Sequence, residues 1–212
     1  MADAMNREAA AIHCQRSVTN RQIIIIAGPP RSGTTIVAHL LSLHPNVWVG
    51  NETHWPLSAM EFGVPCDVAC KLIQQSRGRN IVGDKSPAYV RWIDNLLAWA
   101  GTQLYVIGTV REPSAIVRSI HRAREVFPGF IGWRDWMDSD IETNVKSDMA
   151  IIQRVASTII AMEALDAEPE KTIHSMLAAS ELDDSNYPYI EAIDVVLYGN
   201  VNRAASKPAP LG

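Results

Sequence analysis

The chain has 212 residues, of which 47% are hydrophobic and 20% charged, with a formal net charge of −4, which is typical of one ordinary soluble domain. The negative charge argues against a broad nucleic-acid surface, because binding a phosphate backbone requires clustered Lys and Arg. No apolar run approaches the ~20 residues that cross a bilayer, and the N-terminus lacks the apolar stretch of a signal peptide, so we expect a cytoplasmic protein with no membrane partner.

Two segments are expected: a flexible N-terminal lead-in over residues 1–20 and a single domain over residues 21–212. The chain has three cysteines, too few for a disulfide framework. Cys66 and Cys70 lie four residues apart, but their neighbourhood offers no further metal ligands. We interpret Cys14, Cys66 and Cys70 as reduced structural cysteines.

In chain order, the first predicted element is a buried strand over Gln22–Ala27, an unbroken and largely β-branched apolar run. A loop over residues 28–33 follows. Apolar residues then recur at helical spacing over 34–44, until Pro45 stops the helix. A short strand over 47–49 and a helical region over 57–75 come next.

The second half alternates in the same way. Its predicted elements are a strand ending at Asp84, a helix from Pro87, a strand over 103–110, a helix from Pro113, a loop or lid over 127–140, a helix over 146–155, a strand over 157–165 and a helix over 168–180. Strands alternating with helices predict an α/β fold, a three-layer sandwich with a central parallel sheet. The site is expected at the carboxyl ends of the strands.

The stretch "IIIIAGPPRSGTT", residues 23–35, has the glycine spacing of a Walker A phosphate loop, but Thr34 stands where the lysine belongs. A turn before a helix N-terminus aims backbone N–H groups at an anion. Thr34 and Thr35 add hydroxyls and Arg31 adds a charged hydrogen-bond donor, so we expect a phosphate here. A kinase needs the missing lysine, although Asp84 could serve it as a Walker B acid.

A second basic segment is "YVIGTVREPSAIVRSIHRAR", in which Arg111 leaves a strand end and Ser119 follows eight residues later. Arg118, Arg122 and Arg124 fit a solvated helix face. Two phosphate-type sites at neighbouring strand ends indicate a ligand with phosphates at both its 5′ and 3′ positions. ATP lacks that pattern, whereas 3′-phosphoadenosine 5′-phosphosulfate (PAPS) has it.

On these motifs the chain resembles the PAPS-dependent sulfotransferases, most closely their tyrosylprotein and related bacterial branch, over roughly residues 21–180. "GPPRSGTT" resembles the 5′-phosphosulfate loop, "LSLHPNVWVGNET" the Glu-Thr segment, "GDKSPAYV" the Lys-Ser-Pro motif and "VREPSAIVRSI" the 3′-phosphate motif. "MEALDAEPEKTIHSMLAAS" is similar to the family's Tyr-Glu-Asp-Leu segment, with Met162 replacing the tyrosine and Ala164 the aspartate. The resemblance implies a P-loop NTPase-like sulfotransferase fold.

It also implies the reaction, a transfer of the sulfuryl group of PAPS to an acceptor hydroxyl, with 3′,5′-ADP as product and no metal. The acceptor is expected to be a hydroxyl-bearing small molecule, a sugar or a peptide. The residues expected to bind the PAPS molecule are Pro30, Arg31, Ser32, Gly33, Thr34, Thr35, Arg111 and Ser119.

The implied catalytic residues are Glu52, Arg31 and Lys85. Glu52 matches the general base, while the cations of Arg31 and Lys85 stabilise charge on the bridging oxygen. His54 is the rival base, since imidazole suits proton transfer near neutral pH. Tryptophans at positions 55, 133 and 136 could line the acceptor pocket, although tryptophan side chains more often pack in a core or a lid.

Two alternatives remain open. The first is a P-loop small-molecule kinase that uses Mg-ATP, with Asp84 and Thr35 on Mg²⁺. The second is a catalytically silent homologue that binds PAPS or its product and transfers nothing.

Overall fold

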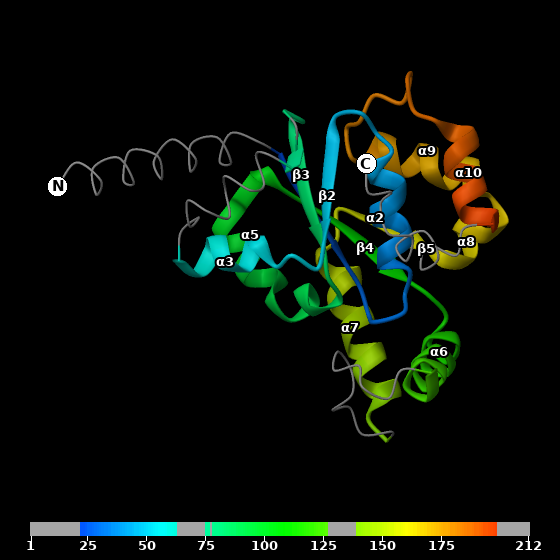
Figure 1. The fold of residues 1–212 in the computed structure, drawn as a ribbon. Helices are drawn as coiled ribbons and strands as arrows, with labels where there is room; N and C mark the ends of the chain where they lie inside the picture. The colour runs from blue at the N-terminus through cyan, green and yellow to red at the C-terminus, as the bar shows by residue number, and fades with distance from the viewer. Residues whose placement is uncertain (1–21, 63–74, 77, 127–138, 199–212) are drawn as a thin grey trace, which may run out of the picture.

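The computed structural model describes residues 22–62, 75–76, 78–126 and 139–198, and within them a single parallel sheet forms the centre of the molecule (Figure 1). Its strand order is β2-β3-β1-β4-β5. Every pairing is parallel. The strands are β1 (Gln22–Ala27), β2 (Val47–Asn51), β3 (Ile81–Lys85), β4 (Leu104–Val110) and β5 (Thr158–Ala161).

Helices cover both faces of the sheet, which confirms the predicted three-layer α/β sandwich (Figure 1). One layer contains α3 (Trp55–Phe62), the 3₁₀ helix η1 (Pro87–Trp92), α5 (Ile93–Ala100) and α7 (Ile141–Val155). The opposite layer contains α2 (Thr34–Ser42), α8 (Met162–Ala167), α9 (Pro169–Ala179) and α10 (Tyr189–Tyr198). The 3₁₀ turn η2 (Gly101–Gln103) leads into β4.

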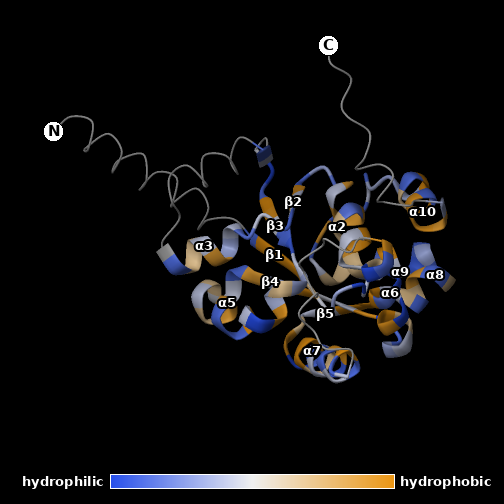
Figure 2. Ribbon diagram, turned by 60° about the horizontal axis from the view of Figure 1, so that its bottom comes forward, coloured by the Kyte–Doolittle hydropathy of each residue, from blue (hydrophilic) through white to orange (hydrophobic). Residues whose placement is uncertain are grey.

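The central strand β1 shows why the two layers form. Ile23 and Ile25 face the α3–α5–α7 layer, while Ile24 and Ile26 face the α2–α9 layer. All four side chains are at most 2% exposed, as expected for a parallel strand covered on both faces. In Figure 2, β1 is drawn largely in the hydrophobic colour.

Helix α6 (Pro113–Val126) has its own small core against α7, and this contact fixes the position of the basic segment. The apolar residues Ile116 and Ile120 of α6 pack against Ile141 and Val145 of α7, and all four are fully buried. The opposite face of α6 is left to its polar residues.

Several predicted boundaries were wrong. The predicted strand over 157–165 ends at Ala161, and Met162 begins helix α8. Pairing with β4 stops at Val110, and the Met-Glu-Ala-Leu sequence that follows consists of strong helix formers. Strand β3 extends one residue beyond Asp84 to Lys85.

Other elements also begin or end differently. Helix α2 ends at Ser42, two residues before the predicted end, and α7 begins at Ile141, five residues before the predicted start. The predicted helix from Pro87 starts as 3₁₀ helix η1, which Ser86 caps by accepting a hydrogen bond from the Ala88 amide. Helix α10 was not predicted.

Some predictions lie outside the described residues. These are the N-terminal lead-in, the three cysteines, the end of the helical region over 57–75, most of the lid over 127–140, and the tryptophans at 133 and 136. Within the described segments, no helix has the length and apolar character needed to span a bilayer.

Candidate functional site

The loop over residues 28–33 is fixed on both sides by the strands that flank β1. On the β3 side, the Ser86 amide donates at 3.2 Å to the carbonyl of Ile26, which lies in β1 two residues before the loop. On the β4 side, the hydroxyls of Ser32 and Thr109 are hydrogen-bonded at 2.6 Å, and both residues are fully buried. The loop therefore has a defined position relative to both neighbouring strand ends.

Two glycines let the loop backbone pass close to its surroundings. A Cβ atom at Gly28 would lie 2.3 Å from Oγ1 of Thr109 and 2.4 Å from its carbonyl oxygen. Gly33 has φ +95° and faces Met162, whose Sδ would lie 2.1 Å from a Cβ at this position. Gly33 is also the N-cap of α2 and brings no capping side chain, so the amides of the first turn remain suited to a bound anion.

Arg31 joins the loop to the basic segment. Its backbone is left-handed, with φ 69°, and its side-chain Nε donates to Oγ of Ser119 at 3.0 Å. Desolvation, followed by the like charge of Arg111, lowers the pKa of Arg31. Arg31 therefore lies beside Arg111 and Ser119 at one edge of the sheet, although at least 80 positions of sequence separate it from either of them.

The N-terminus of α6 is already capped. The carboxylate of Glu112 accepts hydrogen bonds from the amides of Ser114 and Ala115 and from the Ser114 hydroxyl. These bonds, those from Ser114 first, lower the pKa of Glu112. The Glu112 amide in turn donates to Glu163 at 2.9 Å. A ligand on this side would therefore meet Arg111 and Ser119, because the first-turn amides of α6 are already hydrogen-bonded.

Glu52 and Lys85 form an ion pair at the ends of β2 and β3. Lys85 Nζ lies 2.7 Å from Glu52 Oε1, and the Lys85 side chain is 4% exposed, whereas that of Glu52 is 45% exposed. The Glu52 amide also donates to the Lys85 carbonyl at 2.8 Å. The carboxylate is thus reachable from solvent while its partner is buried beneath it.

The turn that carries Glu52 is fastened by Asp84. Asp84 is fully buried, and its carboxylate accepts hydrogen bonds from the amides of Thr53 and His54 at 3.2 and 2.9 Å and from the Tyr89 hydroxyl. Burial, and then the charge of Asp84, raises the pKa of Tyr89. The sequence suggested Asp84 only as a Walker B acid, whereas here its oxygens hold a neighbouring loop.

His54 and Trp55 follow Glu52 but differ in exposure. The imidazole of His54 packs edge-on against the ring of Tyr89, with centroids 6.0 Å apart, and remains a neighbour of Glu52. Trp55 is 1% exposed, and its indole N–H donates to the Gly83 carbonyl at 3.3 Å. Trp55 is therefore a core residue, which is the more common role of a tryptophan, and it does not line an acceptor pocket.

The sequence did not indicate the contacts made by three residues: Thr109, Tyr89 and Met162. Thr109 was detectable in principle as the only polar residue in the apolar stretch that forms β4. The roles of Tyr89 and Met162 depend on contacts with Asp84 and Gly33 that no local pattern encodes. Arg118, by contrast, donates to Ser114 on its own exposed helix face, as predicted for a solvated residue.

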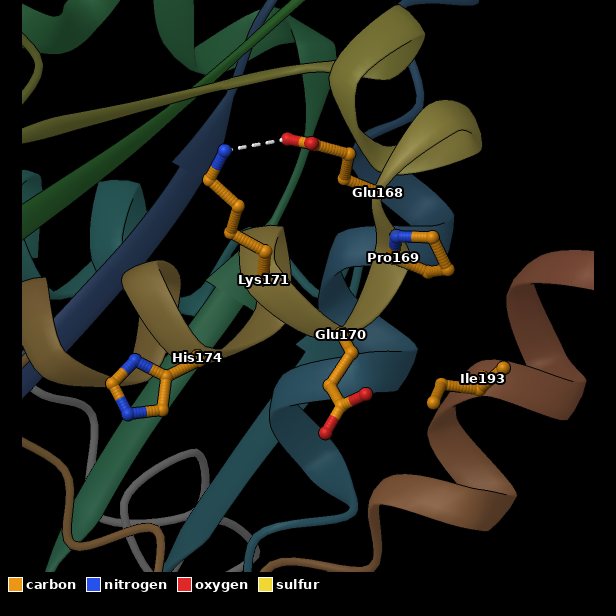
Figure 3. A pocket seen from close by; sticks show the side chains of 6 residues that line it. All are labelled: Glu168, Pro169, Glu170, Lys171, His174 and Ile193. Atoms are coloured by element: carbon orange, nitrogen blue, oxygen red, sulfur yellow. Dashed lines mark hydrogen bonds and ion pairs between the residues drawn. The ribbon is translucent and has the colours of Figure 1, made fainter.

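Elsewhere, a surface cavity of about 520 Å³ lies between α9 and α10 (Figure 3). None of its lining residues belongs to the loops described above, and two of them, Glu168 and Lys171, form an ion pair at 2.7 Å. Among the described residues, no group of three or more His, Cys, Asp or Glu side chains is arranged to hold a metal ion. The carboxyl-end loops therefore remain the candidate site.

Comparison with known proteins agrees with the geometry at the level of the fold. No protein-family model matches the sequence, and a search of curated proteins found no match. Among solved structures, the sulfotransferase domain of the Synechococcus PCC 7002 olefin synthase aligns with TM-score 0.62 and 19% identity, covering 89% of this chain and 82% of that one.

Two further structures align almost as well. A sulfotransferase from Alicyclobacillus acidocaldarius has TM-score 0.58 and 13% identity, with 86% of this chain and 98% of that one covered. A mouse sulfotransferase complexed with PAP has TM-score 0.57 and 11% identity, with coverages of 89% and 68%. The chain therefore has the P-loop NTPase-like α/β fold of the sulfotransferases.

Proposed function

We propose that this chain is a PAPS-dependent sulfotransferase of the EC 2.8.2 type that transfers a sulfuryl group to an acceptor hydroxyl. The observation that carries the proposal is the hydrogen bond from Arg31 Nε to Ser119 Oγ, 3.0 Å long. It brings the phosphate loop after β1 and the basic segment after β4 to one place, as a ligand with 5′ and 3′ phosphate groups requires. A structural neighbour named as a complex with PAP supports the same ligand class.

The residues present suit such a ligand. A Cβ at either glycine of the loop would collide with Thr109 or Met162, so the backbone is held where its N–H groups can cradle a phosphate. We assign the 5′ side to residues 30–35, which end the loop and begin α2, and the 3′ side to Arg111 and Ser119. Arg31 lies between the two groups.

The proposed chemistry uses Glu52, Lys85 and Arg31. PAPS, when bound, supplies the sulfuryl group, whose bond to the 5′-phosphate oxygen breaks as a bond to the acceptor oxygen forms. Glu52 takes the proton of the acceptor hydroxyl. The cations of Lys85 and Arg31 stabilise the electron pair left on the leaving oxygen. The ion pair with Lys85 holds the carboxylate of Glu52 while leaving it accessible.

Two observations disfavour the kinase alternative. Thr34 occupies the position of the lysine that phosphoryl transfer needs and is 4% exposed. Asp84, the candidate Mg²⁺ ligand, is fully buried and already accepts three hydrogen bonds.

Calorimetry with 3′,5′-ADP in the presence of a chelator tests the binding part of the proposal. We expect binding without Mg²⁺ and a loss of about tenfold or more in Arg111→Ala, since hydrogen bonds to charged groups contribute roughly 1.5–3 kcal/mol. Arg122→Ala is the matched control, because it removes an arginine from the exposed face of α6, the helix that follows Arg111. Binding of Mg-ATP alone would instead support a kinase.

Label transfer from PAPS to a panel of phenols, sugars and peptides tests catalysis. Transfer to one class identifies the acceptor. If 3′,5′-ADP binds and no acceptor of any class is labelled, the silent homologue is the better description.

A further inference from the structure

The turn after β2 is held in a conformation that its sequence does not favour. Glu52 and His54 both have φ 55°, in the left-handed region that residues with a Cβ rarely occupy. Neither is a glycine; histidine tolerates this region better than most residues with a Cβ, whereas glutamate does not. Such a turn persists only when its surroundings impose it.

Asp84 supplies much of that constraint. Its two carboxylate oxygens accept hydrogen bonds from the amides of Thr53 and His54, the two residues that directly follow Glu52. The Tyr89 hydroxyl donates to the same carboxylate. Gly50 provides the space, because a Cβ there would lie 2.6 Å from Asp84 Oδ1.

We infer that Asp84 is a positioning residue that sets the direction of the Glu52 carboxylate, an inference that rests on the proposed function. Two successive residues of β3 share the task. Asp84 fixes the backbone after Glu52, and Lys85 fixes both the Glu52 side chain and, through its carbonyl, the Glu52 amide. Without Asp84, the turn would lose the bonds that hold two left-handed residues, and Glu52 would reach Lys85 from a different backbone position.

The position of Asp84 also accounts for the carboxylate buried there. A fully buried carboxylate costs free energy unless it is hydrogen-bonded, and a neutral side chain beside β2 would avoid that cost. Because the carboxylate can accept from three neutral donors at once, it can hold a turn that a neutral side chain could only partly satisfy.

The test compares Asp84→Asn and Tyr89→Phe with Tyr187→Phe. Asn keeps the size of Asp84 but replaces one acceptor oxygen with a donor group. Tyr89→Phe removes the hydrogen bond from the Tyr89 hydroxyl to the carboxylate and leaves Asp84 in place. This variant therefore tests the inference even if Asp84→Asn does not fold. Tyr187→Phe is the matched control, because Tyr187 is also a buried tyrosine whose hydroxyl donates a hydrogen bond, here to the Leu40 carbonyl on the α10 side.

For Asp84→Asn we expect kcat to fall about 10- to 100-fold, the scale of a small misplacement of a reacting group, while the Kd for 3′,5′-ADP changes less than twofold. Tyr89→Phe should show a smaller fall in kcat, and Tyr187→Phe should leave kcat unchanged. The inference is overturned if Asp84→Asn keeps kcat within twofold, or if 3′,5′-ADP binding is lost in parallel with kcat.

Amide hydrogen exchange gives a readout that does not depend on activity. In Asp84→Asn, exchange at Thr53 and His54 should accelerate at least tenfold, whereas exchange in β1 stays slow. Unchanged exchange at these two amides overturns the positioning role. A wild-type chain that protects both amides but neither binds 3′,5′-ADP nor transfers sulfuryl would instead overturn the proposed function.

Discussion

The Glu52–Lys85 ion pair makes an asymmetric prediction about stability. Glu52→Gln leaves the buried ammonium of Lys85 facing a neutral amide, so it should lower the free energy of unfolding by about 1–2 kcal/mol. Lys85→Met removes the buried charge and leaves behind a carboxylate that is already 45% exposed. That variant should lie within about 1 kcal/mol of the wild type.

The strength of the pair can be bounded from its geometry. At the observed separation of 2.7 Å, Coulomb's law gives about 6 kcal/mol at an effective dielectric constant of ~20 and about 1.5 kcal/mol in bulk water. Because Glu52 is partly exposed and solvent screens the pair, the interaction energy should lie nearer the bulk-water figure. We expect a coupling free energy of about 1–2.5 kcal/mol.

A double-mutant cycle in urea, with the wild type, both single variants and the double variant, measures this coupling directly. A coupling below about 0.5 kcal/mol, or a larger loss of unfolding free energy in Lys85→Met than in Glu52→Gln, would refute the reasoning.

The same variants test the proposed chemistry. Glu52→Gln should lower kcat by about 10²–10⁴, and full activity in this variant would exclude Glu52 as the base and favour His54.

Three further predictions concern other positions. Gly28→Ala should destabilise the fold by about 1–3 kcal/mol, because the added Cβ would lie 2.4 Å from the Thr109 carbonyl oxygen. Urea unfolding measures this loss, and an unchanged free energy of unfolding would contradict the close approach. Burial raises the pKa of Asp148 to about 6, above its unfolded value of about 3.9, so stability should fall as pH rises from about 4 through 6. Asp148→Asn should flatten the dependence of stability on pH. Allowing for solvent screening, it should also stabilise the protein at pH 7 by about 1–2 kcal/mol in thermal or urea unfolding. An unchanged dependence on pH would contradict the raised pKa of Asp148. Arg31→Lys removes the Nε group that donates to Ser119, so it should weaken 3′,5′-ADP binding about tenfold. Calorimetry measures this affinity, and an unchanged Kd would contradict the prediction.

The parts of the fold that were predictable from sequence are those that local patterns determine. Strand β1 and the loop after it follow from an unbroken isoleucine run and two spaced glycines, and both lie where predicted. The start of α8 was missed because Met162 continues an apolar run that also suits a strand. Only the loss of β4 pairing after Ala161 decides the outcome.

Part of the candidate site was likewise predictable from sequence, and part was not. Residues at strand ends could be proposed from sequence, including Arg31, Arg111 and Lys85, because parallel strands end at one edge of a sheet. The partners that fix them could not. The hydrogen bond between Arg31 and Ser119 spans 88 residues, and the hold of Asp84 on the Glu52 turn depends on backbone amides that carry no residue-specific signal.

The place of β1 between β3 and β4 also sets a length scale. Neighbouring strands lie about 4.8 Å apart, so the ends of β3 and β4 are separated by roughly 10 Å, with the loop over residues 28–33 between them. Lys85 ends one of these strands and Arg111 follows the other. Under the proposed function, inorganic phosphate or sulfate would fill only part of this span. Affinity should therefore increase with the distance between the charged groups of a ligand, until the ligand reaches from one strand end to the other.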